Sequence, residues 1–190
     1  MTLIGRLLKS RRSGQTLLAW NAPNLASGNA LLLTSPAFED SQTIPVAHAS
    51  KRAGGRNQSP ALDWSGVPSG TEQLLLVIED SDVPMREPFI HCVALIDRSM
   101  SGLPEGALNA DTPAPGVQLL RSGTGRGYLG PAPIKGHGPH RYAFQLFALA
   151  KPLPPPSSST TLESAKPRQV LATVADVLAR GRLDGLYERP

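Results

Sequence analysis

Residues 130–142 read Gly130-Pro-Ala-Pro-Ile-Lys-Gly-His-Gly-Pro-His-Arg-Tyr142, and an alternating apolar run continues directly to Leu149. Each proline fixes φ and removes an amide donor, so the three prolines exclude a helix here. The sequence therefore predicts a stiff, irregular loop that brings His140 and Arg141 to the start of a strand. A histidine beside an arginine suits an anion, because arginine offers a rigid fork of donors to a phosphate or carboxylate. An ordinary turn with a solvated arginine is the alternative.

The composition indicates one domain built from short strands. A chain of 190 residues can bury a substantial core, and its 19 prolines and 18 glycines are too many for a helical bundle. Four of the 19 basic side chains lie in the first twelve residues, and the rest of the chain is balanced in charge, so no nucleic-acid-binding surface is indicated. The single cysteine, Cys92, excludes an internal disulfide, and no apolar run reaches the roughly 20 residues of a membrane span. We therefore predict a cytoplasmic protein.

Two further apolar runs predict strands in the middle of the chain. Leu74–Glu79 is continuous in its apolar residues and is bounded by turn signals, which is typical of a strand buried on both faces. Ile90–Ile96 follows it as a second apolar strand. Leu17–Trp20 and Leu31–Thr34 are predicted as shorter strands, separated by turn residues.

The C-terminal region contains the one predicted helix of convincing length. Apolar residues between Val170 and Leu178 recur at helical spacing, Pro167 suits the first turn, and Gly181 suits the end of the helix. Leu183–Tyr187 is predicted as a last short strand.

Acidic side chains and a histidine follow the predicted central strands. Asp80 and Asp82 are two residues apart on an extended segment, so their carboxylates point the same way and can serve one site. The alternative is an Asx turn before Pro84, in which the aspartates bind their own backbone. His91, near the start of the next strand, matters only if His140 and the aspartates converge on it.

The first residues form a basic, amphipathic segment. Ile4, Leu7 and Leu8 fall on one helical face, and arginines and a lysine lie elsewhere, which is typical of a short helix that touches anionic lipid. We expect instead an extension that packs on the domain or frays, and contact with lipid is the alternative. We assign residues 1–30 to an N-terminal extension of uncertain role and residues 31–190 to the folded domain.

Several motifs, taken in their order along the chain, resemble one family. They are Ser59-Pro-Ala-Leu-Asp-Trp64, Asp80-Ser-Asp-Val-Pro84, His91, Leu103-Pro-Glu-Gly106 and the stretch from Tyr128 to Tyr142. Together they resemble the prokaryotic type of the phosphatidylethanolamine-binding protein family, also called Raf-kinase-inhibitor-like, over roughly residues 30–188. The resemblance implies a mostly β fold with two packed antiparallel sheets in a Greek-key arrangement, few short helices and one C-terminal helix.

The resemblance also implies a small anion pocket at one end of the domain. The pocket residues that carry over are Asp80, Asp82, Pro84, His91, His140 and Arg141, with Gly130, Pro133 and Tyr142 completing the wall. This sequence departs from the family pattern at Ser81, where a proline is usual between the aspartates, and at Cys92, where a bulky aromatic residue is common. The first departure puts the shape of the loop in doubt.

The implied function is the binding of a small anion or a phospholipid head group, phosphate-like or phosphoethanolamine-like, without a cofactor. A kinase or protease partner and a homodimer are compatible with the resemblance. We expect His91 and His140 to donate to the anion, so binding weakens as pH rises; the aspartates would orient an imidazole or pair with Arg141. No catalytic nucleophile is identified, and a non-enzyme is predicted. The alternative is a hydrolase in which two aspartates and two histidines hold a metal that acts on a phosphoester.

Overall fold

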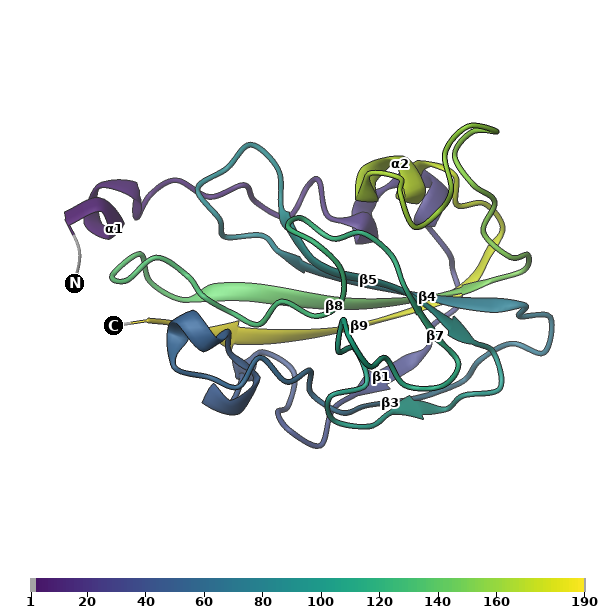
Figure 1. Cartoon of the computed structure of the whole chain (residues 1–190), viewed down its shortest axis with the longest axis horizontal. Coiled ribbons are helices and arrows are strands. Elements are labelled where there is room, and N and C mark those ends of the chain that lie inside the picture. Colours follow the sequence, from purple (N-terminus) through teal and green to yellow (C-terminus); the bar gives the residue numbers. More distant parts are fainter. Residues whose placement is uncertain (1–2, 190) are drawn as a thin grey trace.

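The computed structural model describes residues 3–189, apart from the side chains of Ile4 and Arg6, and strands dominate it (Figure 1). Six strands form a sheet in the order β2-β9-β8-β4-β5-β7, and three form a second sheet in the order β1-β3-β6. All neighbouring strands are antiparallel except the short β2, which runs parallel to β9. The prediction of a mostly β fold with two sheets is confirmed.

The elements have the following bounds. The large sheet contains β2 (Gln42–Thr43), β4 (Gln73–Asp80), β5 (Phe89–Asp97), β7 (Val117–Leu119), β8 (His140–Leu149) and β9 (Val177–Tyr187). The small sheet contains β1 (Leu32–Thr34), β3 (Leu62–Ser65) and β6 (Gly102–Leu103). The helices are α1 (Leu3–Leu8) and α2 (Pro167–Ala172), with four 3-10 turns, η1 (Ala19–Asn21), η2 (Pro23–Leu25), η3 (Val46–His48) and η4 (Lys51–Ala53).

Strand β4 is buried on both faces, as its continuous apolar run predicts. Leu74, Leu76 and Ile78 belong to the core that the large sheet shares with the small one. Leu75 and Val77 alternate with them and belong to a second core on the opposite face, covered by residues of η1, η2 and α2. Burying each such side chain contributes about 1.5–3 kcal/mol to the free energy of unfolding. These two cores fix β4 at the centre of the molecule, and with it the position of Asp80 at its end.

The predicted C-terminal helix is wrong beyond its first turns. Helix α2 ends at Ala172, Asp176 has a left-handed backbone with φ of 54°, and residues 177–187 form β9 along the whole of β8. The apolar residues of this region also fit a period of two, and pairing with β8 satisfies that period and buries Ala179 and Leu183. Gly181 is therefore a close-approach glycine, since a Cβ there would lie 2.8 Å from the Leu31 carbonyl oxygen.

The predictions for shorter segments have mixed outcomes. Leu17–Trp20 is not a strand: η1 begins at Ala19, Leu18 and Ala19 are buried, and Ala19 belongs to the core on the outer face of the large sheet. The strand predicted at Leu31–Thr34 is confirmed as β1. The loop before β8 is confirmed, because residues 129–139 belong to no strand or helix, and Gly136 and Gly138 take left-handed φ angles there.

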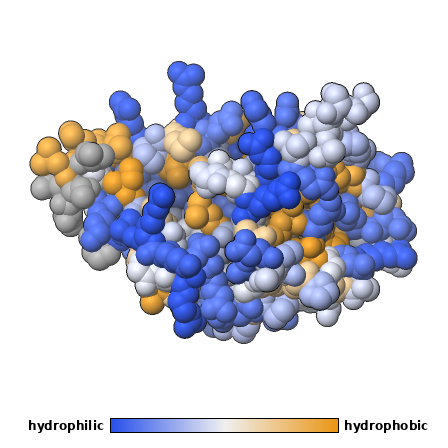
Figure 2. Space-filling view, in the orientation of Figure 1, coloured by the Kyte–Doolittle hydropathy of each residue, from blue (hydrophilic) through white to orange (hydrophobic). Residues whose placement is uncertain are grey.

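The amphipathic N-terminal segment does form a helix, α1, at one end of the molecule (Figure 1). Leu3 and Leu7 are 79% and 72% exposed, and Figure 2 shows an apolar patch at that end of the surface. Contact with lipid stays a prediction. Within residues 3–189, no helix has the length and apolar character needed to span a bilayer.

Candidate functional site

A cavity of about 650 Å³ opens where β4 ends and where β5 and β8 begin. It brings together seven of the nine residues that the sequence predicts for a site: Asp80, Pro84, His91, Gly130, Pro133, His140 and Tyr142. Much of its remaining wall is apolar and comes from Val83, Met85, Phe89, Leu129, Ala132 and Ile134. The cavity thus has several polar side chains at the strand ends, and much of its remaining wall is apolar.

His91 reaches this cavity through a β-bulge. The pairing of β4 with β5 shifts from Ile78 opposite Cys92 to Glu79 opposite Ile90, which leaves His91 as the extra residue. A bulge re-aims a side chain and is common beside functional sites. The Nδ1 atom of His91 lies 2.6 Å from the Leu129 carbonyl oxygen, so this nitrogen carries the proton and donates it. Nε2 makes no hydrogen bond with any described residue and stays available to a ligand.

His91 loses its proton at a lower pH than a solvated histidine does, because its pKa is lowered. Burial lowers its pKa, and this effect outweighs the opposing pull of the Asp80 carboxylate and of the bond to the Leu129 carbonyl. The ring is also held edge-on by Phe89 and Tyr142, with centroid distances of 5.0 and 5.1 Å. His91 is therefore a rigid, neutral acceptor at Nε2 that becomes a donor when it gains a proton.

Tyr142 places a hydroxyl in the cavity without a partner. The residue is 1% exposed, and its hydroxyl makes no hydrogen bond of ordinary geometry within residues 3–189, although the Asp80 carboxylate and the Ala132 backbone lie beside it. Burial raises the pKa of this phenol well above its ordinary value, and the neighbouring Asp80 charge raises it further, so the hydroxyl keeps its proton. Burying a hydroxyl without a good hydrogen bond costs folding free energy, and a ligand atom that accepts from the hydroxyl would offset this cost.

His140 is placed differently from the expectation that it donates to an anion. Its Nδ1 lies 2.7 Å from Oδ2 of Asp80, and its Nε2 lies 2.7 Å from Nδ1 of His137. Both ring nitrogens are therefore engaged within the protein. The role expected for Asp80, that of orienting an imidazole, fits this contact.

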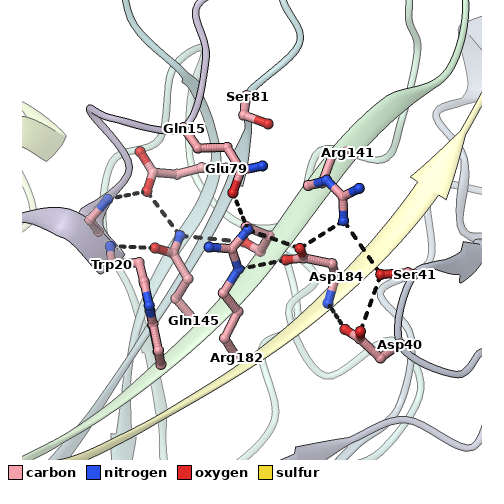
Figure 3. A network of polar contacts seen from close by, with 12 residues as sticks. Gln15, Trp20, Asp40, Ser41, Glu79, Ser81, Arg141, Gln145, Arg182 and Asp184 are labelled. Carbon is pink, nitrogen blue, oxygen red and sulfur yellow. Dashed lines mark hydrogen bonds and ion pairs between the residues drawn. The ribbon is translucent and has the colours of Figure 1, made fainter. Parts of the chain in front are cut away.

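Asp82 and Arg141 do not line the cavity. Adjacent residues on a strand point to opposite faces, so Arg141 turns away from the side that His140 and Tyr142 occupy. Its guanidinium lies 2.9 Å from Asp184, beside Ser41, as Figure 3 shows. The Asp82 carboxylate accepts the Arg141 backbone N–H at 2.7 Å and pairs with Arg12. Asp82 thus meets the backbone of Arg141 and not its side chain.

Sequence reasoning missed some residues beside the cavity. The apolar wall residues Met85, Phe89 and Ile134 carry no signal that separates them from ordinary loop and strand residues. Arg52 lines the rim from a polar stretch in which several basic residues are equivalent by sequence. His137 had a signal, its three-residue spacing from His140, but that spacing has no fixed meaning outside a helix.

Alanine at Gly130 should distort the cavity wall. A Cβ there would lie 2.3 Å from the His48 carbonyl oxygen and 2.6 Å from the backbone of Ala49 and Ser50, so the chain must move. We expect Gly130→Ala to cost about 1–3 kcal/mol, which is typical of overpacking, as measured by urea unfolding. Gly28→Ala is the matched control, because nothing lies within 4 Å of its Cβ position. An unchanged stability of Gly130→Ala would contradict the close approach.

Other reactive groups near the site offer little chemistry. Burial raises the pKa of the Cys92 thiol to about 12, which disfavours the reactive thiolate. Among residues 3–189, no three histidine, cysteine, aspartate or glutamate side chains are grouped as the ligands of a metal would be.

Comparison with known proteins identifies a related group. The sequence model described as phosphatidylethanolamine-binding protein matches residues 34–188. A Mycobacterium tuberculosis protein named UPF0098 protein Rv1910c is 34% identical over 174 residues, which cover 90% of this chain and 77% of that protein. The crystal structure of Escherichia coli YbcL, described as a member of the mammalian PEBP family, is 27% identical with a TM-score of 0.75, covering 84% of this chain and 99% of YbcL. The structure of the PEBP homologue CT736 from Chlamydia trachomatis is 30% identical with a TM-score of 0.70, covering 86% of this chain and 100% of CT736.

Proposed function

This chain belongs to the phosphatidylethanolamine-binding protein family, and from that premise we propose that its cavity binds a small anion or an anionic head group of the phosphate or phosphoethanolamine type. The observation that carries the proposal is a pair of polar atoms on residues that line the cavity, the Tyr142 hydroxyl and Nε2 of His91, for which residues 3–189 provide no hydrogen bond of ordinary geometry. Both belong to rigid, buried rings that contact each other edge-on. A site built in this way is preorganised for a ligand oxygen.

The two groups suggest how an oxyanion is held. The phenol donates its O–H, and His91 donates from Nε2 once it is protonated, so two donors converge on one anion. Arg52 at the rim adds a cation. The apolar walls suit an organic portion attached to the anion, and the cavity is far larger than one phosphate group requires. These features support an anion with an apolar or ethanolamine-like body.

Anion binding should strengthen as pH falls. Because burial lowers the pKa of His91, this ring is mostly neutral at pH 7. The ring must therefore take up a proton when the anion binds. Above that pKa the affinity should fall up to about tenfold per pH unit, and below it the affinity should level off. Sulfate is a suitable probe, since its charge is constant between pH 5 and 8, and NMR titration of the His91 ring measures its affinity.

Two variants define this test. His91→Gln should bind sulfate weakly and without pH dependence. His48→Gln is the matched control, because His48 is also buried and also bonds a backbone carbonyl through Nδ1, yet it lies outside the cavity lining. An affinity for sulfate that is the same at pH 5 and pH 8 in the unaltered protein would refute the role of His91.

The hydrolase alternative has less support from the geometry, because both ring nitrogens of His140 are bonded to protein groups. We therefore propose a binding protein and expect no turnover of a phosphoester when divalent metal is added.

A kinase or protease partner at the cavity rim, where Met85 is 57% exposed, stays a prediction, as do the homodimer and the cytoplasmic location.

A further inference from the structure

A segment before the folded domain is bound to the loop that forms one wall of the cavity. We call residues 8–14 the strap. The backbone N–H groups of Ser13 and Gly14 donate to the carbonyl oxygens of Val83 and Ser81 at 2.9 and 2.8 Å, and the Ser13 hydroxyl donates to the same Ser81 carbonyl. Val83 itself lines the cavity. The strap thus contacts the loop of residues 81–88 between β4 and β5, which we call the wall loop.

The strap is also bound to the loop before β8. The Arg12 guanidinium pairs with Asp82 and donates to the Pro139 carbonyl oxygen at 2.9 Å. His137, which is fully buried, places Nε2 at 2.8 Å from the Leu8 carbonyl oxygen and at 3.2 Å from that of Arg11. A carbonyl oxygen only accepts, so His137 must carry a proton on Nε2.

Proton counting then gives a definite result for the histidine pair. A neutral His137 has its single ring proton on Nε2, facing the strap. A neutral His140 beside an ionised Asp80 has its single proton on Nδ1, facing the carboxylate. Nδ1 of His137 and Nε2 of His140 would then both be lone pairs, and two lone pairs repel each other at their separation of 2.7 Å. The contact requires one additional proton between the rings.

We propose that Asp80, His140 and His137 form a buried binding site for one shared proton, and that this proton holds the strap against the cavity wall. With the proton bound, the three groups carry one negative and one positive charge, and the burial of each charge is compensated by the other. Without it, the carboxylate is an uncompensated buried charge and the bond between the rings is lost. This inference does not depend on what the cavity binds.

The direction of the pH effect follows from the groups that face the pair. The Asp80 carboxylate on β4 contacts the pair directly, and His91 on β5 is a titratable ring beside it. Arg12 on the strap is neutralised by Asp82 from the wall loop, and the phenol of Tyr142 stays uncharged. Raising the pH therefore removes the shared proton to solvent and turns the contact between Nδ1 of His137 and Nε2 of His140 from attractive to repulsive. This repulsion displaces the His137 ring, and with it the Nε2–H that the strap carbonyls accept, so the strap is released.

The primary test uses the unaltered chain over pH 5–9. Nitrogen-15 NMR of the His137 and His140 rings should show one proton leaving the facing nitrogens together. Over the same pH step the exchange protection of the Ser13 and Gly14 amides, measured against unstructured-peptide rates, should fall at least tenfold. Two rings that titrate separately, facing nitrogens that are both unprotonated at every pH, or amide protection that ignores the step would each overturn the proposal.

Variants separate the proton from the strap contact. His137→Gln retains a donor for the strap carbonyls but does not titrate, so protection of Ser13 and Gly14 should no longer depend on pH. His137→Phe keeps a ring without a donor, and protection should be low throughout. His48→Gln, a buried histidine outside this cluster, should behave as the unaltered chain. If His137→Phe fails to fold, the ring signals of the unaltered chain still decide the question.

Discussion

Replacing Tyr142 with phenylalanine should stabilise the free protein and weaken its binding of an anion at least tenfold. The hydroxyl is buried and makes no hydrogen bond of ordinary geometry within residues 3–189, so its removal relieves a desolvation cost of about 1 kcal/mol. The same hydroxyl is the proposed donor to the ligand, and a hydrogen bond to a charged group is worth about 1.5–3 kcal/mol. Urea unfolding and sulfate titration measure the two opposite effects.

Tyr128→Phe is the matched control for this prediction. Tyr128 is also buried, but its hydroxyl donates to the His48 carbonyl oxygen at 3.0 Å. Its removal leaves that carbonyl unpaired and should cost about 1 kcal/mol of stability without a comparable loss of anion affinity. If Tyr142→Phe destabilised the protein as Tyr128→Phe does, the Tyr142 hydroxyl would have a partner in the fold and the proposed site would lose its main support.

Replacing Arg168 with methionine should cost about 3 kcal/mol of stability. Arg168 on α2 lies 2.7 Å from Oε1 of Glu79, a fully buried carboxylate on β4. The other oxygen of Glu79 accepts from the Ala19 N–H and from the side chain of Gln145, part of the network in Figure 3. Without Arg168 the buried charge loses its counter-ion, and the loss of one partner of a buried pair costs about 3–5 kcal/mol. The estimate takes the lower end because the arginine is 34% exposed.

A double variant and an exposed ion pair complete this test by urea unfolding. Glu79→Gln combined with Arg168→Met removes both charges and should recover most of the lost stability. Lys151→Met breaks the pair with Asp176, whose side chains are 78% and 55% exposed, and should cost less than about 1 kcal/mol. Equal losses for Arg168→Met and Lys151→Met would show that the Glu79 charge is not buried in solution.

Much of the fold was predictable from short-range features of the chain. The continuous apolar runs at Leu74–Glu79 and Ile90–Ile96 are strands because a run of that length suits a sheet covered on both faces, and β4 and β5 are such strands. The prolines before His140 exclude a helix by local geometry alone. The order of the motifs added the family, which the comparisons confirm.

The C-terminal region shows where local pattern fails. Apolar residues between Val170 and Leu178 satisfy a helical period, while Val177, Ala179, Leu183 and Tyr187 satisfy the period of a strand, so the sequence does not separate the two. Nothing in the sequence of residues 177–187 shows that the edge of the ten-residue strand β8 is free to pair with them. In the structure, β9 pairs along this edge. Tertiary pairing outweighs the modest helix propensity of these residues.

By itself, the sequence determined which strands carry the polar side chains, because the apolar patterns of those strands are clear, and only the resemblance to the family placed the side chains at one end of the sheets. Only the tertiary structure decided which groups those side chains contact. His140 is bonded to Asp80, 60 residues earlier, and to His137; Arg141 turns to the opposite face of β8. The physical reason is that a buried polar group needs a hydrogen-bond partner, and these partners come from distant parts of the chain.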